Sequence, residues 1–224
     1  MKPTLLAFAG IAAVGLSLAA RAHLHAAALR RTVAELEHAT THDRLTGLHN
    51  RAGLEQAWNS PASARPVVAV LDLDGFKPVN DRHGHAAGDV VLATVAARLA
   101  RTIPGTVARL GGDEFAALLP AGVDAEQLAH RVAAAVAEPI PLPGAARVTV
   151  TTSIGLSRPG SRRLGEALGQ ADAAMYRAKT TRTTVARFDP HRDDRSSTTA
   201  DPRPVLRVRD LPRVNAGREV PAPC

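Results

Sequence analysis

Aromatic side chains are scarce in this sequence, since Phe, Trp and Tyr together make up 3% of its 224 residues. A hydrophobic core therefore has to be built from Ala, Val and Leu. Cysteine is nearly absent as well: Cys224 is the only one and the last residue, so no disulfide can form within the chain. The length fits one globular domain with extensions, or at most two small domains.

Lysine is nearly missing among the basic residues. Of 28 Lys and Arg residues only three are lysines, at Lys2, Lys77 and Lys179. Lys is a compact point charge whereas Arg is a planar fork, so the two lysines in the body are candidates for contacts that Arg does not fit. The net charge of +7 is spread along the chain. Without a concentrated basic stripe, a duplex-binding face is disfavoured, and no nucleic-acid partner is expected.

The N-terminal region contains a run without charge at 4–20. Its length lies at the short end of the range for a membrane-spanning helix. Lys2 precedes it and three arginines follow within 21–31, which favours a cytoplasmic C-terminal side. A cleaved signal peptide is the competing interpretation, because "ARA" at 20–22 resembles a cleavage site. Residues 1–22 are thus interpreted as a transmembrane or signal-anchor helix.

Two further segments flank the body of the chain. Residues 23–40 are predicted to be a helical linker, because Leu29, Val33 and Leu36 recur at helical spacing. Such a stripe serves either as a packing face or as a coiled coil that pairs two subunits. Residues 189–224 are rich in Pro, Arg, Asp, Ser and Thr without an apolar period, which predicts a disordered tail.

The body, residues 41–188, alternates helical and extended patterns. The stretch 66–74 is a continuous apolar run that ends in acids, as is typical of a buried central strand. Periodicity predicts further elements at 86–101 (helix), 107–119 (hairpin), 125–137 (helix), 147–157 (strand), 164–179 (helix) and 185–188 (strand). This alternation predicts an α+β fold, an α/β sandwich with one central mixed sheet flanked by helices.

The predicted hairpin has an unusual bend, because Asp113 and Glu114 stand side by side after two glycines. Like charges repel, and Gly-Gly weakens a regular element. Asp72 ends the strand 66–74, where a carboxylate without a partner is costly to bury. If the two strands are neighbours, Asp72 and Asp113 meet at one edge of the sheet. A divalent cation such as Mg²⁺, held by one or two carboxylates together with water and phosphates, would relieve the repulsion.

Five stretches of the body resemble the motifs of the GGDEF family, in the order and spacing of that family. They are "DRLTGLHNR" (43–51), "LDLDGFKPVNDRHGHAAGDVVL" (71–92), "RLGGDEFAALL" (109–119), "TTSIGLS" (151–157) and "ADAAMYRAK" (171–179). Members of this family are diguanylate cyclases, which condense two GTP molecules into cyclic di-GMP and release pyrophosphate. The resemblance covers 41–188 and implies a GGDEF-like catalytic domain with a nucleotidyl-cyclase or palm-like architecture.

The resemblance also implies roles for single residues. Asp72, the backbone carbonyl of Leu73, and Asp113 match ligands of Mg²⁺ or Mn²⁺. Asp113 also matches the proton acceptor for the attacking 3′-hydroxyl, and Lys77 matches a lysine that stabilises the transition state. His85 would lie in a substrate loop. The substrate contacts that the resemblance implies are Asn80, His85, Asp89, Lys179, Arg109 and Glu114.

Partners and location follow from the same resemblance. Each subunit of the family binds one GTP, so catalysis implies a homodimer with two facing sites. GTP is available only inside the cell, which favours the anchor over the signal peptide at the N-terminus. The expected location is the inner or cytoplasmic membrane, with a single pass and the catalytic domain in the cytoplasm.

Two departures from the family pattern stand out. Thr102 and Gly105 occupy the positions of an Arg-x-x-Asp product-inhibition site, so feedback through it is expected to be absent. After Lys179 the family runs Lys-x-x-Gly-Arg-Asn, whereas here Arg182 replaces the Gly and Thr183 the Arg. Either Arg182 reaches the same phosphate or the contact is lost. A catalytically inactive domain that binds GTP or cyclic di-GMP is the alternative to an active cyclase.

Overall fold

The computed structural model describes most of the body of the chain. The described residues are 21, 23–31, 38–60, 66–144 and 146–193. The uncharged run at 4–20 lies outside them, as does the part of the predicted tail that begins at 194. Within the described ranges, no helix has both the length and the apolar character that crossing a membrane requires. The predicted linker is described only at 23–31 and 38–40, and both pieces are helical.

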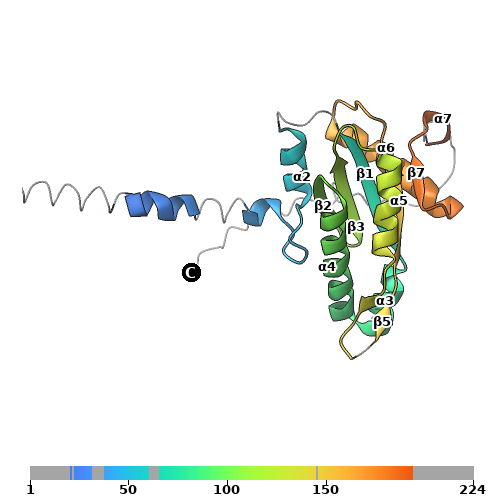
Figure 1. The fold of residues 1–224 in the computed structure, drawn as a ribbon, viewed down its shortest axis with the longest axis horizontal. Coiled ribbons are helices and arrows are strands. Elements are labelled where there is room, and N and C mark those ends of the chain that lie inside the picture. The colour runs from blue at the N-terminus through green and yellow to red at the C-terminus, as the bar shows by residue number, and fades with distance from the viewer. Residues whose placement is uncertain (1–20, 22, 32–37, 61–65, 145, 194–224) are drawn as a thin grey trace, which may run out of the picture. The chain divides into compact units, whose positions relative to one another are not determined.

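A five-stranded sheet forms the centre of the fold, with the strand order β2-β3-β1-β6-β7. The middle strand β1 (Val67–Asp74) pairs antiparallel with β3 (Glu114–Leu119) on one side and β6 (Thr151–Leu156) on the other. The edges are β2 (Thr106–Gly111), antiparallel to β3, and β7 (Val185–Arg187), parallel to β6. The sheet is therefore mixed, and the predicted α+β class is confirmed (Figure 1).

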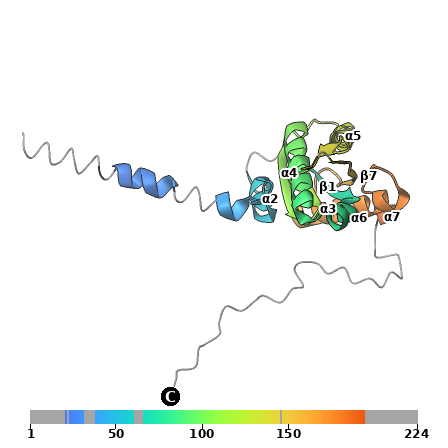
Figure 2. The same ribbon diagram turned by 90° about the horizontal axis from the view of Figure 1, so that it is seen from below.

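Helices cover both faces of this sheet, as Figures 1 and 2 show. Their bounds are α2 (Arg51–Trp58), α3 (Phe76–His83), α4 (His85–Thr102), α5 (Ala125–Val136), α6 (Leu164–Thr181) and α7 (Pro190–Asp193). Alternate residues of β1 face opposite layers. Ala69 and Leu71 belong to the core cluster that contains α4 and α5, while Val68 and Val70 belong to the cluster of α2 and α6. Burial on both faces explains the continuous apolar run of β1.

The predicted strand 147–157 is wrong in its extent, because the structure divides it into two pieces. Residues Arg147–Val148 form β5, which pairs with β4 (Ile140–Pro141) in a separate two-stranded sheet. Only residues from Thr151 onward join the central sheet as β6. Strict alternation of side chains predicts extended backbone, but it does not tell which neighbour each part of the strand pairs with.

Helix α3 was not predicted, and the expected substrate loop around His85 is wrong. His85 is the first residue of α4, and Gly84 alone separates α3 from α4. The α3 sequence "FKPVNDRH" has no apolar period, and Pro78 argues against a helix at first sight. Proline is tolerated in a first helical turn, because the N–H groups there have no partner within the helix. Gly75, at φ +80°, turns the chain from β1 into α3.

The folded domain extends to Asp193, five residues into the predicted tail. Asp193 is buried, and Nε of Arg177 donates to its carboxylate at 2.7 Å. Burial alone would raise the pKa of Asp193, but the hydrogen bond and charge of Arg177 and the N–H of Asp189 lower it. The contact between Arg177 and Asp193 thus fastens α7 to α6.

A buried arginine joins α4 to α5. Arg98 is 7% exposed, and its guanidinium donates to the carbonyls of Val136, Glu138 and Pro139 at 3.0, 2.6 and 3.0 Å. These carbonyls lie at the C-terminal end of α5, where helix carbonyls lack partners and the helix dipole favours a cation. Arg98 therefore caps α5 from a neighbouring helix.

Three histidines stack where the N-terminal segment joins the domain. The rings of His38 and His42 are parallel within 3°, with centroids 3.8 Å apart, and the rings of His42 and His49 lie 4.4 Å apart. Nδ1 of His49 is buried without a hydrogen-bond partner. Burial, followed by the charges of His42 and His38, lowers the pKa of His49, although a hydrogen bond to the backbone of Thr41 raises it.

The stack makes the domain sensitive to acid. Because the folded state holds His49 neutral, the unfolded chain binds the proton first as the pH falls below the ordinary value of 6.5. Stability is therefore lost as the pH falls through that value. We expect His49→Asn to flatten the dependence of the free energy of unfolding on pH, measured by urea unfolding at a series of pH values. The exposed His83, changed to Gln, is the control, and equal slopes in all three proteins would refute the assignment.

Candidate functional site

The acids of the predicted hairpin meet the end of β1. Asp72 lies directly across from Glu114 in the register of β1 and β3, and the N–H of Leu73 donates to the carbonyl of Asp113 at 3.3 Å. The expectation that Asp72 and Asp113 converge at one edge of the sheet is therefore confirmed. Glu114, assigned above to the substrate, is the direct cross-strand neighbour of Asp72.

Two glycines make the turn before Asp113 possible. Gly111 has φ +152° and Gly112 has φ +53°, both outside the range that other residues readily adopt. The register between β2 and β3 also shifts between Arg109 and Gly111. The bulge and the turn together bring Asp113 back toward β1.

Burial and neighbouring carboxylates raise the pKa values of two acids at the end of β1, Asp113 and Glu114. Burial, and next the charge of Asp72, raise the pKa of Asp113. Burial, Asp72 and Asp172 raise the pKa of Glu114. These four carboxylates repel one another, and a bound cation would relieve this repulsion.

The ammonium group of Lys179, in the last turn of α6, lies beside these acids. Its Nζ donates to Oδ1 of Asp72 at 2.5 Å. Burial would lower the pKa of Lys179, but the hydrogen bond to Asp72 and the charges of Asp74 and Asp113 raise it. One of the two lysines singled out in the sequence thus lies beside the acids.

The donors at this edge fit a magnesium ion that the substrate completes. Asp72 and Asp113 offer carboxylates, and Leu73, which follows Asp72 in β1, offers a backbone carbonyl. In the described ranges, no three His, Cys, Asp or Glu side chains are arranged as a closed metal cage. Mg²⁺ is commonly bound by only one or two carboxylates, with phosphates and water in the remaining positions. The chemistry of the donor set therefore suits Mg²⁺ or Mn²⁺ with a triphosphate.

Arg109 binds partners within the protein. Its guanidinium donates to both carboxylate oxygens of Asp43 at 3.2 Å and to the carbonyl of Gly112 at 3.0 and 2.8 Å. The Arg109 side chain is only 13% exposed. In this arrangement Arg109 braces the glycine turn, and its contact with the substrate stays a prediction. Asp43 is its partner, and sequence reasoning did not anticipate this contact.

Asp43 is well prepared for this contact. It accepts hydrogen bonds from the N–H and the hydroxyl of Thr46 at 2.9 and 2.7 Å. Burial alone would raise the pKa of Asp43, but these bonds and Arg109 lower it. The ionised carboxylate thus connects the N-terminal turn of the domain with the turn that carries Asp113.

The remaining predicted site residues lie on two helices. Lys77 and Asn80 are on α3, while His85 and Asp89 are in the first turns of α4. Oδ1 of Asn80 is buried without a hydrogen-bond partner. It faces Gly88, where a Cβ would lie only 1.9 Å from that oxygen. The absence of a side chain at Gly88 therefore makes room for the Asn80 amide between the helices.

The positions of the absent Arg-x-x-Asp site hold no charge. The hydroxyl of Thr102 donates to the carbonyl of Arg98 at 2.8 Å. Gly105 approaches Leu118 so closely that a Cβ would lie 2.2 Å from the Leu118 carbonyl oxygen. An Asp at this position would require the backbone to move.

Comparison with known proteins gives a consistent result. The family model described as "Diguanylate cyclase, GGDEF domain" matches residues 40–184. The diguanylate cyclase TpbB of Pseudomonas aeruginosa is 42% identical over 159 residues, which are 65% of this chain and 37% of that protein. An uncharacterized 19.3 kDa protein of Streptomyces ambofaciens is 40% identical over 70% of this chain and 85% of its own length. The chain spans 21%, 37% and 25% of three curated relatives, so it matches only part of them.

Solved structures support the same fold. The GGDEF domain of TpbB from P. aeruginosa superposes with a TM-score of 0.58 at 38% identity, covering 66% of this chain and 94% of that one. The coiled coil and GGDEF domain of DgcB from Caulobacter crescentus, in complex with c-di-GMP, superposes with a TM-score of 0.65 at 26% identity. That match covers 76% of this chain and 97% of the DgcB chain.

The brace formed by Arg109 predicts a measurable loss of stability. Arg109→Ala removes hydrogen bonds of a charged donor, so we expect the free energy of unfolding to fall by about 2 kcal/mol. Urea unfolding of Arg109→Ala, Asp43→Ala and the double variant gives the coupling between the two side chains. The exposed Arg162, changed to Ala, is the control and should alter stability by less than about 0.5 kcal/mol. A coupling of zero would show that the pair does not act together.

The crowded carboxylates predict that Mg²⁺ stabilises the fold and that the effect depends on pH. The pKa values of Asp113 and Glu114 are raised above 3.8 and 4.5. The unfolded chain loses these protons first as the pH rises, so metal-free protein loses stability between the ordinary and the raised values. Mg²⁺ that binds only the folded state adds about 2.7 kcal/mol at a hundredfold excess over its Kd.

Thermal unfolding in EDTA and in Mg²⁺, between about pH 4 and pH 8, measures both effects. Asp113→Asn should flatten the profile in EDTA and weaken the response to Mg²⁺, while the exposed Glu126, changed to Gln, should leave both unchanged. A response to Mg²⁺ that is the same with and without Asp113 would place the ion elsewhere.

Proposed function

This chain belongs to the GGDEF-domain family of diguanylate cyclases, and we propose that it condenses two GTP molecules into cyclic di-GMP with release of pyrophosphate. The observation that carries this proposal is the meeting of Asp72 and Asp113 at the end of β1, beside Lys179. Carboxylates that repel one another beside a lysine suit a triphosphate with a bound metal ion. Phosphoryl transfer depends on the positioning of the reactants and on the stabilisation of their charge.

Asp113 is the proposed proton acceptor. The 3′-oxygen of one GTP attacks the α-phosphorus of the other, the bond to the pyrophosphate leaving group breaks, and the 3′-hydroxyl proton passes to the Asp113 carboxylate. Asp72, Asp113 and the Leu73 carbonyl would hold Mg²⁺ or Mn²⁺, which when bound polarises phosphate oxygens and offsets their charge.

The two lysines are proposed to hold the phosphates from opposite sides. Lys77 lies in the first turn of α3, just after the end of β1, and is exposed. Lys179 comes from the last turn of α6. Each would balance the negative charge that moves to the leaving group, and the ammonium of Lys179 would pass from Asp72 to phosphate oxygen.

Asn80 and Asp89 are proposed to bind guanine, with His85 beside them. Guanine presents N–H donors that neither adenine nor the sugar offers in the same place. The unpaired Oδ1 of Asn80 is an acceptor that such a donor would satisfy. Glu114, next to Asp72, is proposed to support the metal position rather than the base.

The proposal includes a homodimer and a membrane tether. One GTP per subunit requires two domains with facing sites, and the segment 23–40, which the sequence predicts to be helical, would pair them. Residues 1–22 would anchor the chain as a single pass in the inner membrane, with the catalytic domain on the cytoplasmic side. The uncharged run at 4–20 and the arginines that follow it support this part of the proposal.

A catalytically inactive domain that binds GTP or cyclic di-GMP is the second candidate. The altered run after Lys179 favours it, because Thr183 stands where the family has an arginine. The two candidates differ in turnover and not in binding.

The proposed function is tested by incubating the purified full-length chain with GTP and Mg²⁺ and measuring cyclic di-GMP by chromatography. We expect product from the natural chain and at least about a hundredfold less from Asp113→Asn, the loss typical of a missing general base. Glu126→Gln, an exposed acid on α5, should retain the activity. A folded, dimeric chain that binds GTP and forms no product would instead establish the inactive binding domain.

A further inference from the structure

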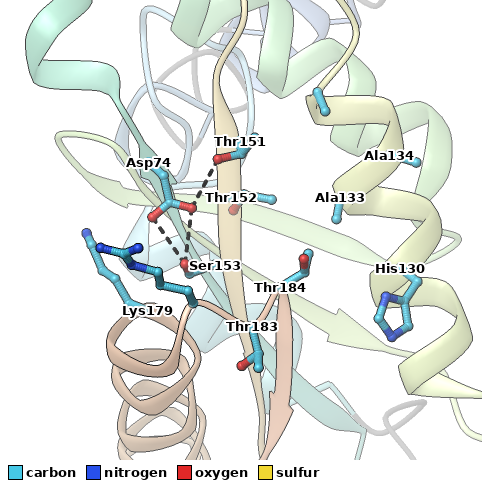
Figure 3. A pocket seen from close by; sticks show the side chains of 12 residues that line it. Asp74, His130, Ala133, Ala134, Thr151, Thr152, Ser153, Lys179, Thr183 and Thr184 are labelled. Carbon is cyan, nitrogen blue, oxygen red and sulfur yellow. Dashed lines mark hydrogen bonds between the residues drawn. The ribbon is translucent and has the colours of Figure 1, made fainter.

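A polar pocket of about 510 Å³ opens between α5, β6 and the turn that follows α6. Figure 3 shows Thr151, Thr152 and Ser153 of β6 with Thr183 and Thr184 on one side, and His130, Ala133 and Ala134 of α5 on the other. Lys179 and Asp74 lie at the end of the pocket nearest the acids. The pocket therefore begins where the proposed metal position ends.

The pocket exists because β7 is shorter than β6. Pairing between them starts at Ile154, whose N–H donates to the carbonyl of Thr184 at 2.8 Å. Along a strand, backbone groups of residues two apart point to the same edge. Thr152 therefore directs its N–H and carbonyl toward the pocket, where β7 does not reach. Such an open sheet edge is a recognised place for an anion.

Three donors in the pocket are unengaged. Across the described part of the chain, no hydrogen bond or ion pair involves the side chains of Arg182, Thr184 or His130, although all three line the pocket. Other hydroxyls are occupied, since those of Ser153 and Thr151 donate to the carboxylate of Asp74 at 3.1 and 3.4 Å. The unengaged groups offer a cationic fork, a hydroxyl and an imidazole to a ligand.

Arg182 holds its place in an uncommon backbone conformation. It ends α6 with φ +56°, and in the described residues it is the only non-glycine residue with a positive φ. A residue other than Gly or Asn is disfavoured there. This is the departure noted in the sequence: the family's glycine has become arginine, and the arginine of the next position has become Thr183. The cation is thus moved by one residue to a position that lines the pocket.

The charges of the pocket suit an anion that carries a metal ion. Lys179 and Arg182 are positive, and the Asp74 carboxylate is negative. Lys179 belongs to both sites, since its Nζ bonds Asp72 while its side chain lines the pocket. A group that leaves the metal position would meet Lys179 first and Arg182 next.

We propose that this pocket receives magnesium pyrophosphate, with Arg182, Thr184 and His130 binding its phosphate oxygens. The inference rests on the proposed function, because pyrophosphate is the leaving group of that reaction. It assigns Arg182 and Thr184 to product binding and leaves the transfer step to Asp113 and the metal ligands.

Calorimetric titration of the full-length chain with magnesium pyrophosphate tests the inference directly. We expect binding, weakened about tenfold by each of Arg182→Gly and Thr184→Val, the loss of one hydrogen bond to a charged group. Arg182→Gly relieves the positive φ and Thr184→Val keeps the side-chain shape, so neither change endangers the fold. Arg162→Ala is the matched control: it removes an exposed cation that does not line the pocket and should change the affinity by less than about twofold.

Opposite results would overturn the inference. If Lys77→Ala abolishes binding while Arg182→Gly and Thr184→Val leave it unchanged, pyrophosphate occupies the catalytic position and not the pocket. A chain that does not bind pyrophosphate at all refutes the inference as well. Cyclic di-GMP formation, measured on the same preparations, separates the two proposals. Product formation without pyrophosphate binding in the pocket refutes only the pocket proposal. Pyrophosphate binding in the pocket without product formation refutes only the proposed cyclase activity.

Discussion

The antiparallel pairing of β1 with β3 is the constraint on which the rest of the site depends. Its register sets Asp72 opposite Glu114 and fixes the N–H of Leu73 on the carbonyl of Asp113. A shift by one residue would turn every side chain of β3 to the other face. The fully buried Phe115 opposes this shift, because its ring would then have to fit the α2–α6 side of the sheet, where the small Ala116 now packs. Ordinary apolar packing therefore holds carboxylates together that repel one another.

Much of this arrangement could be predicted from the sequence, and the reason differs from part to part. The strand β1 could be predicted because a strand buried on both faces has a continuous apolar sequence. The turn could be predicted because two adjacent glycines are typical of a sharp bend. What the sequence did not predict was α3, a short and largely polar helix without an apolar period, in which only Val79 is buried. The contact of Arg109 with Asp43 was also missed, because the partners are 66 residues apart and each looks like an ordinary surface charge.

Arg98 is another charged residue whose position could not be predicted from the sequence. A charged residue in an amphipathic helix is usually assigned to the solvated face, yet Arg98 is buried and completes the end of α5. Arg98 is buried because it binds carbonyls at the end of another helix, and the sequence around Arg98 gives no sign of these partners. Arg182 is a similar case. The turn after α6 sets the position of its cation, and the α6 sequence does not reveal that position.

The brace between Asp43 and Arg109 also limits where the domain can be cut. Asp43 precedes α2 and every strand of the sheet, and its carboxylate binds Arg109 and Thr46. A fragment that started at α2 would contain all five strands and all the acids of the metal position. It would nevertheless leave the Arg109 guanidinium with only the Gly112 carbonyl to bind. The smallest unit with a correctly supported glycine turn therefore begins before Asp43, in a segment that a boundary drawn by secondary structure would discard.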